Sequence, residues 1–290
     1  MKQKTALVLS GGGARGIAHI GVIEELEKRD YEISSVAGAS MGSVIGAVYS
    51  MGKLPEFKEW ICSLDRMKVF RLIDFTFSWQ GLIKAEKVLN EMKHFIPDGN
   101  IEDMRIPYSA VAVDLVNKKE VVFSKGSVYN AIRASIAIPT VVTPVETGEG
   151  LLIDGGVLNN IPVNHVHRNQ GDIMVAVDVN ADIPVVRPKV TKKEHEANQS
   201  AYQKKLDEFY AYLKNIHIFP HEEKLGYLDL IDQTISLMML HMSQDNLKDT
   251  PPDILVNISR NSCNTFDFYR AEELIEMGRL AAQEALDKKK

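Results

Sequence analysis

A chain of 290 residues that is 45% hydrophobic and 25% charged has the composition of an ordinary globular protein, which excludes a disordered or fibrous chain. Thirty-four basic and 39 acidic residues give a net charge of −5, so no positive field holds a polyanion by counterion release. We therefore expect no nucleic-acid partner. The two cysteines, Cys62 and Cys263, match no metal spacing and no disulfide framework, which favours a reducing, cytoplasmic location.

The first residues superficially resemble a secretory signal, because two lysines precede apolar side chains. The apolar run from Ala6 to Leu9 is shorter than the h-region of about 7 to 15 residues, and glycines follow it at once. We interpret it as a buried first strand. No uninterrupted apolar run approaches the roughly 18 residues that a spanning helix needs. Any membrane contact is expected to be peripheral.

Short β-rich runs alternate with helical patterns, which predicts an α/β fold with a largely parallel central sheet and helices on both faces. The predicted strands cover residues 5–9, 33–38, 109–116, 120–124, 151–153, 173–179 and 254–258. The third and fourth of these are joined by Asn117-Lys118-Lys119 and are expected to form a hairpin. Predicted helices cover residues 17–26, 41–52, 127–136 and 267–286.

Residues 187–224 interrupt this alternation, because they are dense in Lys and Glu and contain few β-branched side chains. A helical pattern over residues 227–246 follows. We interpret residues 187–247 as a helical insertion within a single domain that spans residues 1–290.

A glycine-rich loop, Ser10-Gly11-Gly12-Gly13-Ala14-Arg15-Gly16, lies where the first predicted strand gives way to a helix. The glycines permit positive φ and leave backbone N–H groups unobstructed, and the helix that follows adds the positive end of its dipole. The loop therefore predicts a site that binds an anion.

Two nucleotide-binding motifs match this loop only in part. Gly11, Gly13 and Gly16 satisfy G-x-G-x-x-G, but the second strand ends without the acidic residue that binds a ribose. A phosphate-binding P-loop requires Lys and Ser or Thr where Ile17-Ala18 stands. A nucleotide site is therefore disfavoured.

The second predicted strand ends in Gly38-Ala39-Ser40-Met41-Gly42, a G-x-S-x-G sequence between a strand and a helix. Gly38 and Gly42 relieve the crowding of a sharp turn, so that the Ser40 hydroxyl projects into a cleft. The strand–helix–strand unit should be right-handed and parallel, which brings this turn beside the glycine loop at the carboxyl edge of the sheet. The pattern predicts that Ser40 is a nucleophile facing N–H donors.

An activated serine needs a base. Of the eight histidines, His165 and His167 come nearest to the position that an α/β-hydrolase would use. Three aspartates, Asp114, Asp154 and Asp178, end apolar runs. Asp154 is favoured because the glycines that follow it let the backbone approach another loop, and the other two are expected to cap strands or bind turns.

These blocks resemble the patatin-like phospholipases, and specifically their small bacterial members. The segment Gly11-Gly12-Gly13-Ala14-Arg15-Gly16 is similar to the family's oxyanion block, Gly38 to Gly42 to its nucleophile elbow, and Asp154-Gly155-Gly156 to its D-G-[GA] block. Residues 131–139, ahead of Thr143-Pro144-Val145, look like its remaining segment. The four blocks cover about residues 5–180.

The resemblance implies a three-layer α/β/α fold and a Ser-Asp dyad without a catalytic histidine, acting on acyl esters of lipids. Ser40 is then the nucleophile and Asp154 the base, with N–H groups of the glycine loop holding the oxyanion. Arg15 is expected to support that loop or to bind a lipid phosphate. No metal and no cofactor is expected.

The expected partner is a lipid or acyl-ester substrate, whose chain needs an apolar slot. Candidate linings are the aromatic residues Phe70, Phe75, Phe77 and Trp79, and the methionine-rich stretch of residues 235–242. Two other interpretations stay open: a serine esterase or thioesterase for soluble acyl substrates, and a regulatory protein with low turnover on the same fold. The sequence leaves open the headgroup, the acyl length and the oligomeric state.

Overall fold

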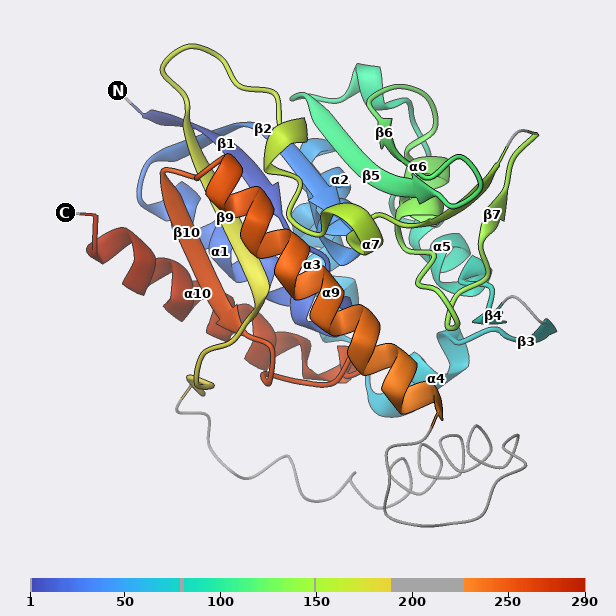
Figure 1. Ribbon diagram of the computed structural model, residues 1–290. Helices are drawn as coiled ribbons and strands as arrows, with labels where there is room; N and C mark the ends of the chain where they lie inside the picture. Colours follow the sequence, from blue (N-terminus) through green and yellow to red (C-terminus); the bar gives the residue numbers. More distant parts are fainter. Residues whose placement is uncertain (1, 79–80, 149, 189–226, 290) are drawn as a thin grey trace.

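The computed structural model describes residues 2–78, 81–148, 150–188 and 227–289 (Figure 1). Its main sheet has eight strands in the order β10-β9-β1-β2-β5-β8-β7, and β6 also pairs with β5. These strands are β1 (Gln3–Leu9), β2 (Tyr31–Ala39), β5 (Tyr108–Asp114), β6 (Lys119–Phe123), β7 (Val145–Glu146), β8 (Leu151–Asp154), β9 (Ile173–Ala181) and β10 (Ile254–Ser259). A separate small sheet contains β3 (Phe75–Ser78) and β4 (Gly81–Ile83).

The sheet is largely parallel, as predicted. Strands β10, β9, β1, β2 and β5 run in one direction. Strands β6, β8 and β7 are antiparallel to their neighbours, and β5 and β6 form the predicted hairpin. Because β1 and β2 are parallel neighbours, the segments that follow them leave the sheet at the same edge.

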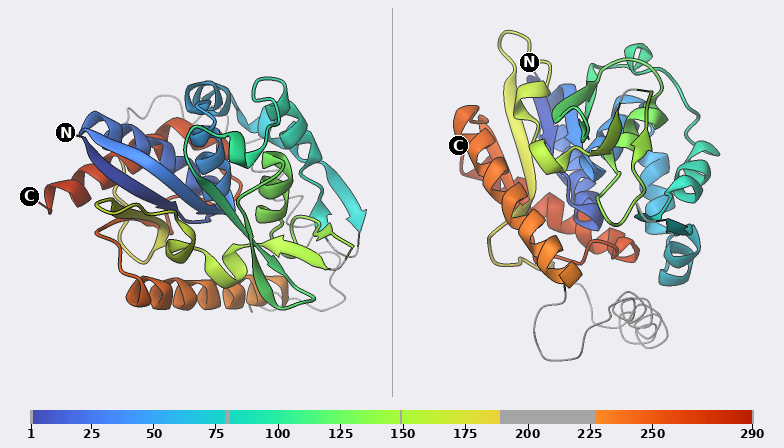
Figure 2. Two further views of the ribbon diagram at one scale, coloured as in Figure 1. Left: turned by 90° about the horizontal axis from the view of Figure 1, so that it is seen from above. Right: turned by 45° about the vertical axis from the view of Figure 1, so that its right-hand side comes forward.

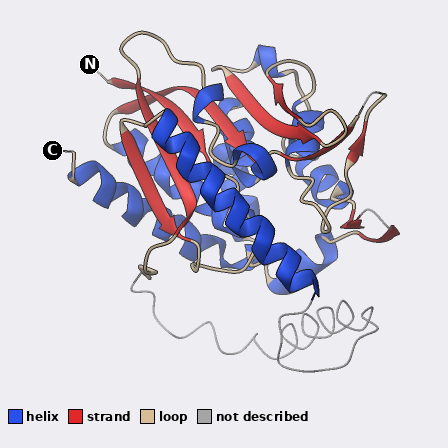
Figure 3. Cartoon of the chain, viewed as in Figure 1, coloured by secondary structure: helices blue, strands red, loops and turns tan. Residues whose placement is uncertain are grey.

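Helices cover both faces of the sheet (Figures 2 and 3). One face carries α1 (Ala18–Lys28), α2 (Met41–Ser50) and α10 (Ala271–Asp287), and the other carries α7 (Gly156–Asn159) and α9 (Tyr227–Asp249). The remaining helical elements are α3 (Leu54–Cys62), α4 (Arg66–Leu72), α5 (Glu86–Lys93), α6 (Val128–Ser135), η1 (Gly13–Ile17), η2 (Ile101–Asp103), η3 (Val163–His165) and η4 (Phe268–Arg270).

Side chains of β1 alternate between two cores. Leu7 and Leu9 belong to the large core that includes α1, α2 and α10, whereas Val8 packs with Ile161 and Met174 on the opposite face. A strand that is buried on both faces is apolar at nearly every position, which explains why the sequence pattern identified it. This three-layer α/β/α arrangement is the predicted fold.

The structure also departs from the predicted elements. Strand β5 ends at Asp114, and Leu115 and Val116 lie in the hairpin turn, where both are exposed. Helices α3, α4, α5 and α7 and strands β3, β4 and β7 were not expected. The helix expected over residues 227–246 is observed as α9, whereas residues 189–226 of the expected insertion lie outside the described residues. Within the described residues, no helix combines the length and hydropathy needed to cross a membrane.

Helices α1 and α10 cross so closely that their contact admits only glycine. A Cβ atom on Gly21 would lie 1.8 Å from the carbonyl oxygen of Ile275, and one on Gly278 would lie 1.9 Å from that of Ala18. Replacing glycine by alanine inside a helix normally stabilises it by about 1 kcal/mol. Here alanine should instead destabilise the protein, because its Cβ atom would collide with the backbone of the other helix.

We expect Gly278→Ala to lower the free energy of unfolding by about 1–3 kcal/mol, the usual cost of overpacking a core. Urea denaturation followed by circular dichroism measures this change. Gly99→Ala is the control, because a Cβ atom there meets nothing within 4 Å. A Gly278→Ala variant as stable as the wild type would contradict the close helix crossing.

Candidate active site

Strand β5 brings the ends of two other strands together. Strand β2 runs parallel to β5 and pairs Ala39 with Val111, whereas β8 runs antiparallel to β5 and pairs Asp154 with Ala112. Both lie on the edge of β5 opposite β6. The carboxyl ends of β2 and β8 therefore face each other. Ser40 follows β2 directly, so the structure places it beside Asp154.

Ser40 has a backbone conformation that side chains rarely adopt, with φ +50° and ψ −127°. Its carbonyl oxygen accepts hydrogen bonds from the Ser43 N–H at 2.9 Å and the Ser43 hydroxyl at 2.6 Å. A Cβ atom on Gly38 would lie 2.4 Å from the backbone of Gly42, and one on Gly42 would lie 2.2 Å from the carbonyl oxygen of Leu9. Both positions of the predicted elbow therefore require glycine, and the turn is held in a strained conformation.

The glycine loop after β1 lies against this turn. A Cβ atom on Gly11 would lie 2.9 Å from the Cβ atom of Ser40, and one on Gly16 would lie 2.4 Å from the Met41 side chain. The predicted juxtaposition of the two loops at one edge of the sheet is therefore observed.

The loop's hydrogen bonds narrow the choice of oxyanion donors. The N–H groups of Gly11 and Ala14 already donate to backbone carbonyl oxygens, at 3.1 and 2.9 Å. Within the described part of the chain, no group accepts the N–H groups of Gly12 and Gly13. Gly13 has φ +56°, which favours glycine, whereas Gly12 is extended and has no room for a side chain because Val179 lies beside it.

Arg15 supports the loop from the side. Its guanidinium donates to Asn180 Oδ1 at 3.0 Å and to the carbonyl oxygen of Cys263 at 3.3 Å. Asn180 Nδ2 in turn donates to the carbonyl oxygen of Gly11 at 2.7 Å. Because a trans peptide is planar, a fixed Gly11 carbonyl directs the Gly12 N–H the opposite way. Of the two roles expected for Arg15, these contacts correspond to the support of the loop.

Asp154 is a buried carboxyl group with 4% of its surface exposed. Its Oδ1 accepts the N–H of Gly156 at 2.8 Å, whereas its buried Oδ2 has no partner of standard hydrogen-bond geometry within the described residues. Burial raises the pKa of Asp154 to about 6, and hydrogen bonding with the nearby Ser40 hydroxyl and with the Gly156 N–H opposes that rise. At neutral pH this carboxyl group is mostly ionised, and it is a stronger base than an exposed aspartate.

The other two strand-end aspartates are held by turns. Asp114 accepts two backbone N–H groups and the Asn117 side chain in the β5–β6 hairpin, and the Asn117 contacts are the main cause of its lowered pKa. Asp178 accepts the N–H of Asn180 at 2.8 Å, and burial raises its pKa. Neither has a hydrogen bond to Ser40.

Among the described residues, no histidine side chain is hydrogen-bonded to Ser40 or Asp154. His165 Nε2 pairs with Glu120 at 2.6 Å. His19 is fully buried, and its Nε2 donates to the carbonyl oxygen of Ser10 at 2.8 Å at the start of the glycine loop. Burial lowers the pKa of His19 to about 4, so this ring is neutral. His195, His217 and His221 lie outside the described residues.

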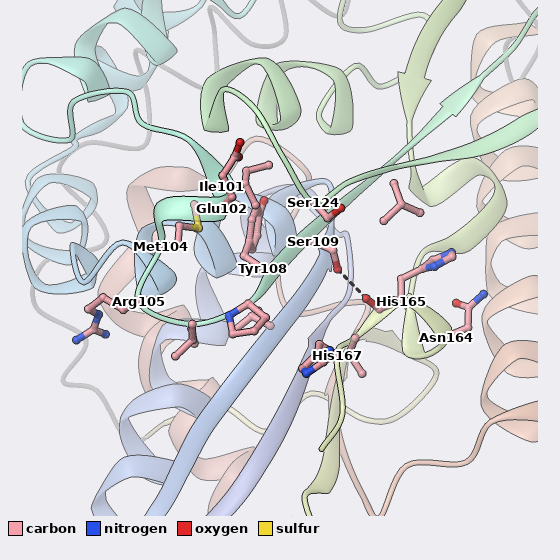
Figure 4. Close-up of a pocket in the computed structure, with 15 residues that line it drawn as sticks. Ile101, Glu102, Met104, Arg105, Tyr108, Ser109, Ser124, Asn164, His165 and His167 are labelled. Carbon is pink, nitrogen blue, oxygen red and sulfur yellow. Dashed lines mark hydrogen bonds between the residues drawn. The ribbon is translucent and has the colours of Figure 1, made fainter. Parts of the chain in front are cut away.

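Two surface cavities lie away from Ser40. One, of about 630 Å³, is at the amino end of β5, where the Ser109 hydroxyl donates to the carbonyl oxygen of His165 (Figure 4). The other, of about 820 Å³, is lined by residues of α1, α3 and α10. Neither is lined by Ser40 or Asp154, so neither argues for a reaction centre.

Helix α9 lies beside the Asp154 loop. A Cβ atom on Gly156 would lie 2.7 Å from Cε of Met239, which belongs to the methionine-rich stretch proposed to line an acyl slot. The neighbouring side chains Leu237 and Met238 are 56% and 58% exposed. Trp79, from the aromatic candidates, lies outside the described residues.

A strained serine at a strand–helix turn, a buried aspartate beside it and a glycine loop against it define an α/β protein with a nucleophile-elbow architecture. A sequence profile described as patatin-like phospholipase matches residues 7–167. An uncharacterized NTE family protein of Mycobacterium tuberculosis is 33% identical over 329 residues, which cover 98% of this chain and 91% of that protein. The chain belongs to the patatin-like phospholipase family.

More distant similarities extend over most of the chain. Lysophospholipase NTE1 of Kluyveromyces lactis is 25% identical over 284 residues, covering 95% of this chain and 19% of that protein. The crystal structure of VipD from Legionella pneumophila aligns with 99% of this chain and 67% of its own, at 13% identity and a TM-score of 0.48.

The raised pKa of Asp154 has a consequence for stability. The folded protein holds this proton up to about pH 6, whereas an unfolded aspartate releases it near 3.8, so folding stability falls as the pH rises between these values. The difference between the two pKa values corresponds to a loss of about 3 kcal/mol in the free energy of unfolding, and an uncharged Asn at this position avoids that loss.

We therefore expect the free energy of unfolding of Asp154→Asn, relative to that of the wild type, to increase by up to about 3 kcal/mol as the pH rises from 4 to 8. Urea denaturation at both pH values measures the two free energies of unfolding. A difference between variant and wild type that is the same at both pH values would contradict a buried, ionised carboxylate.

Proposed function

We propose that this protein is a serine acyl hydrolase that cleaves ester bonds of lipids, with the activity of a phospholipase A or lysophospholipase, through Ser40 and Asp154. The observation that carries the proposal is the position of these two side chains at the facing ends of β2 and β8, where burial gives Asp154 a pKa of about 6. Membership of the patatin-like phospholipase family, and the similarity to a protein named lysophospholipase, support lipid esters as the substrate class.

In the first half of the proposed reaction, Asp154 Oδ2 accepts the Ser40 proton while Ser40 Oγ attacks the ester carbonyl carbon. The N–H groups of Gly12 and Gly13 stabilise the oxyanion of the tetrahedral intermediate. The intermediate collapses to an acyl-enzyme, and Asp154 returns the proton to the alcohol that leaves. In the second half, Asp154 takes a proton from the water molecule that attacks the acyl-enzyme. The intermediate then collapses, Asp154 gives this proton to Ser40 Oγ, and the carboxylic acid is released.

Two features of the environment favour an aspartate as the base. A carboxylate with its ordinary pKa of 3.8 is a poor acceptor for an alcohol proton, and the value of about 6 brings it closer to the range in which general bases work. Its Oδ2, which has no partner of standard hydrogen-bond geometry among the described residues, is also available for the Ser40 proton. The scheme therefore needs no imidazole.

Helix α9 supports a lipid rather than a soluble ester as the substrate. Met239 lies beside Gly156, and Leu237 and Met238 expose apolar surface on the same helix. Methionine side chains adapt to flexible apolar ligands, as an acyl chain is. The turnover of one ester can be compared when the ester is monomeric and when it forms micelles. A lipid hydrolase turns over faster on micelles, whereas an esterase for soluble substrates does not.

We expect Ser40→Ala to lower hydrolysis of a lysophospholipid by about 10³-fold or more, and Asp154→Asn by about 10²- to 10⁴-fold. Labelling of Ser40 by a fluorophosphonate should slow in parallel in Asp154→Asn, because both reactions require deprotonation of the same hydroxyl. Titration of released fatty acid and gel detection of the label are the measurements.

Asp114→Asn is the matched control, because this aspartate also ends a strand but its carboxylate accepts hydrogen bonds from the hairpin turn and none from Ser40. It should keep wild-type turnover and labelling. An active Asp154→Asn together with an inactive, folded Asp178→Asn would reassign the base. A wild type that neither turns over lipid esters nor reacts with the fluorophosphonate would overturn the proposed function.

We expect Gly13→Val to lower kcat by about 10²- to 10³-fold with little change in KM, because losing one oxyanion donor has this effect. A valine disfavours φ +56°, and its Cβ would lie 2.7 Å from Thr265. Gly126→Val is the control for backbone strain, because Gly126 has φ +82° with nothing within 4 Å of its Cβ position. Equal kcat values for the two variants would remove Gly13 from the donors.

A further inference from the structure

Ser135, the last residue of α6, connects the Ser40 turn to β5. Its side chain is completely buried. The Ser135 hydroxyl accepts the N–H of Ser40 at 3.0 Å and donates to the carbonyl oxygen of Val111 at 2.6 Å. Val111 is the β5 residue that pairs with Ala39, immediately before Ser40. One hydroxyl group thus joins the backbone of Ser40 to the strand on which β2 ends.

The segment that follows α6 also holds Asp154. The carbonyl oxygen of Ala137 accepts the N–H of Asp154 at 2.9 Å. Residues 135 and 137 therefore bind the backbones of both proposed reacting residues, whereas neither residue is hydrogen-bonded to the Ser40 hydroxyl or the Asp154 carboxylate among the described residues.

The Ser40 N–H depends on this contact. It lies in a buried turn with φ +50°, and the Ser135 hydroxyl is its acceptor. An unsatisfied buried N–H costs about 1–3 kcal/mol, and strained backbone persists only where the surroundings determine it. The same bond also removes the Ser40 N–H from the groups that could stabilise an oxyanion.

We propose that Ser135 is a positioning residue that holds the strained Ser40 turn, and that residues 135–137 set the separation of the Ser40 hydroxyl from the Asp154 carboxylate. The inference rests on the proposed function and adds a residue to it that contacts neither substrate nor reacting atoms. Without the Ser135 hydroxyl, the Ser40 turn relaxes, and the Ser40 hydroxyl moves away from the Asp154 carboxylate.

The test compares Ser135→Ala and Ser135→Cys with the wild type on a water-soluble p-nitrophenyl ester across pH 4 to 9. A misplacement of about 1 Å costs up to about 10²-fold in rate, so Ser135→Ala should lose about 10- to 100-fold in kcat at nearly constant KM. Because the Ser40 hydroxyl lowers the pKa of Asp154, the acidic limb of the pH profile should move to higher pH. Ser135→Cys keeps a weak donor and acceptor and should be intermediate in both measurements.

Ser50→Ala is the matched control, since Ser50 is also a completely buried serine at a helix end but its hydroxyl has no partner among the described residues. It should keep the wild-type kcat and pH profile. Thermal melts show which variants are folded. If Ser135→Ala does not fold, the kcat and the pH profile of Ser135→Cys are compared with those of the wild type instead.

A folded Ser135 variant with the wild-type kcat and pH profile would overturn the inference and leave the proposed function standing. A loss of turnover that follows only the unfolded fraction, with an unchanged acidic limb, would overturn it as well. A wild type without Ser40-dependent hydrolysis would overturn the proposed function and this inference together.

Discussion

The antiparallel pairing of β8 with β5 is the constraint on which the candidate site depends. In a purely parallel sheet, the carboxyl ends of all strands point in the same direction. Two strands that pair with the same edge of a third strand therefore cannot meet with their carboxyl ends facing each other. Here β2 occupies the first half of that edge and β8 enters from the other end, so that Ala39 and Asp154 pair with consecutive residues of β5. The glycine after Asp154 follows from this meeting, because a Cβ atom on Gly155 would lie 2.2 Å from the carbonyl oxygen of Val111. At Gly155 the chain turns out of β8 while its backbone is in contact with β5, which leaves no room for a side chain.

The sequence contained the parts of this arrangement that depend on local geometry. Ser40 and the glycine loop could be predicted because a sharp strand–helix turn and an exposed row of N–H groups each need glycine at fixed spacings. The buried strands could be predicted because both of their faces are apolar. Asp154 was preferred to Asp114 and Asp178 on the glycines that follow it, and the contact between Gly155 and Val111 is the physical reason for that signal.

The supporting contacts could not be predicted, because their partners are far apart in the chain. Ser40 and Ser135 are 95 residues apart, and Asn180 and Gly11 are 169 apart. A serine at the end of a helix and an asparagine after a strand are common, and only the folded chain shows which backbone groups they bind. The elements that the sequence pattern missed are short, so each offers too few residues for a period to be recognised; they are α3, α4, α5, α7, β3, β4 and β7.

The chemistry proposed for Asp154 and the packing of the second face of the sheet are linked through desolvation. Burial is the largest cause of the raised pKa of Asp154, so every group that excludes water from its carboxylate contributes to its strength as a base. The loop after Asp154 is covered by α9, whose Met239 lies against Gly156. Helix α9 therefore places Met239 against the loop that follows Asp154, and it exposes Leu237 and Met238 as apolar surface that an ester chain could contact. Ionisation of Asp154 then costs folding stability at the pH where the base is needed, and the fixed backbone around Ser40, Ser135 and Ala137 keeps the carboxylate in place despite that cost.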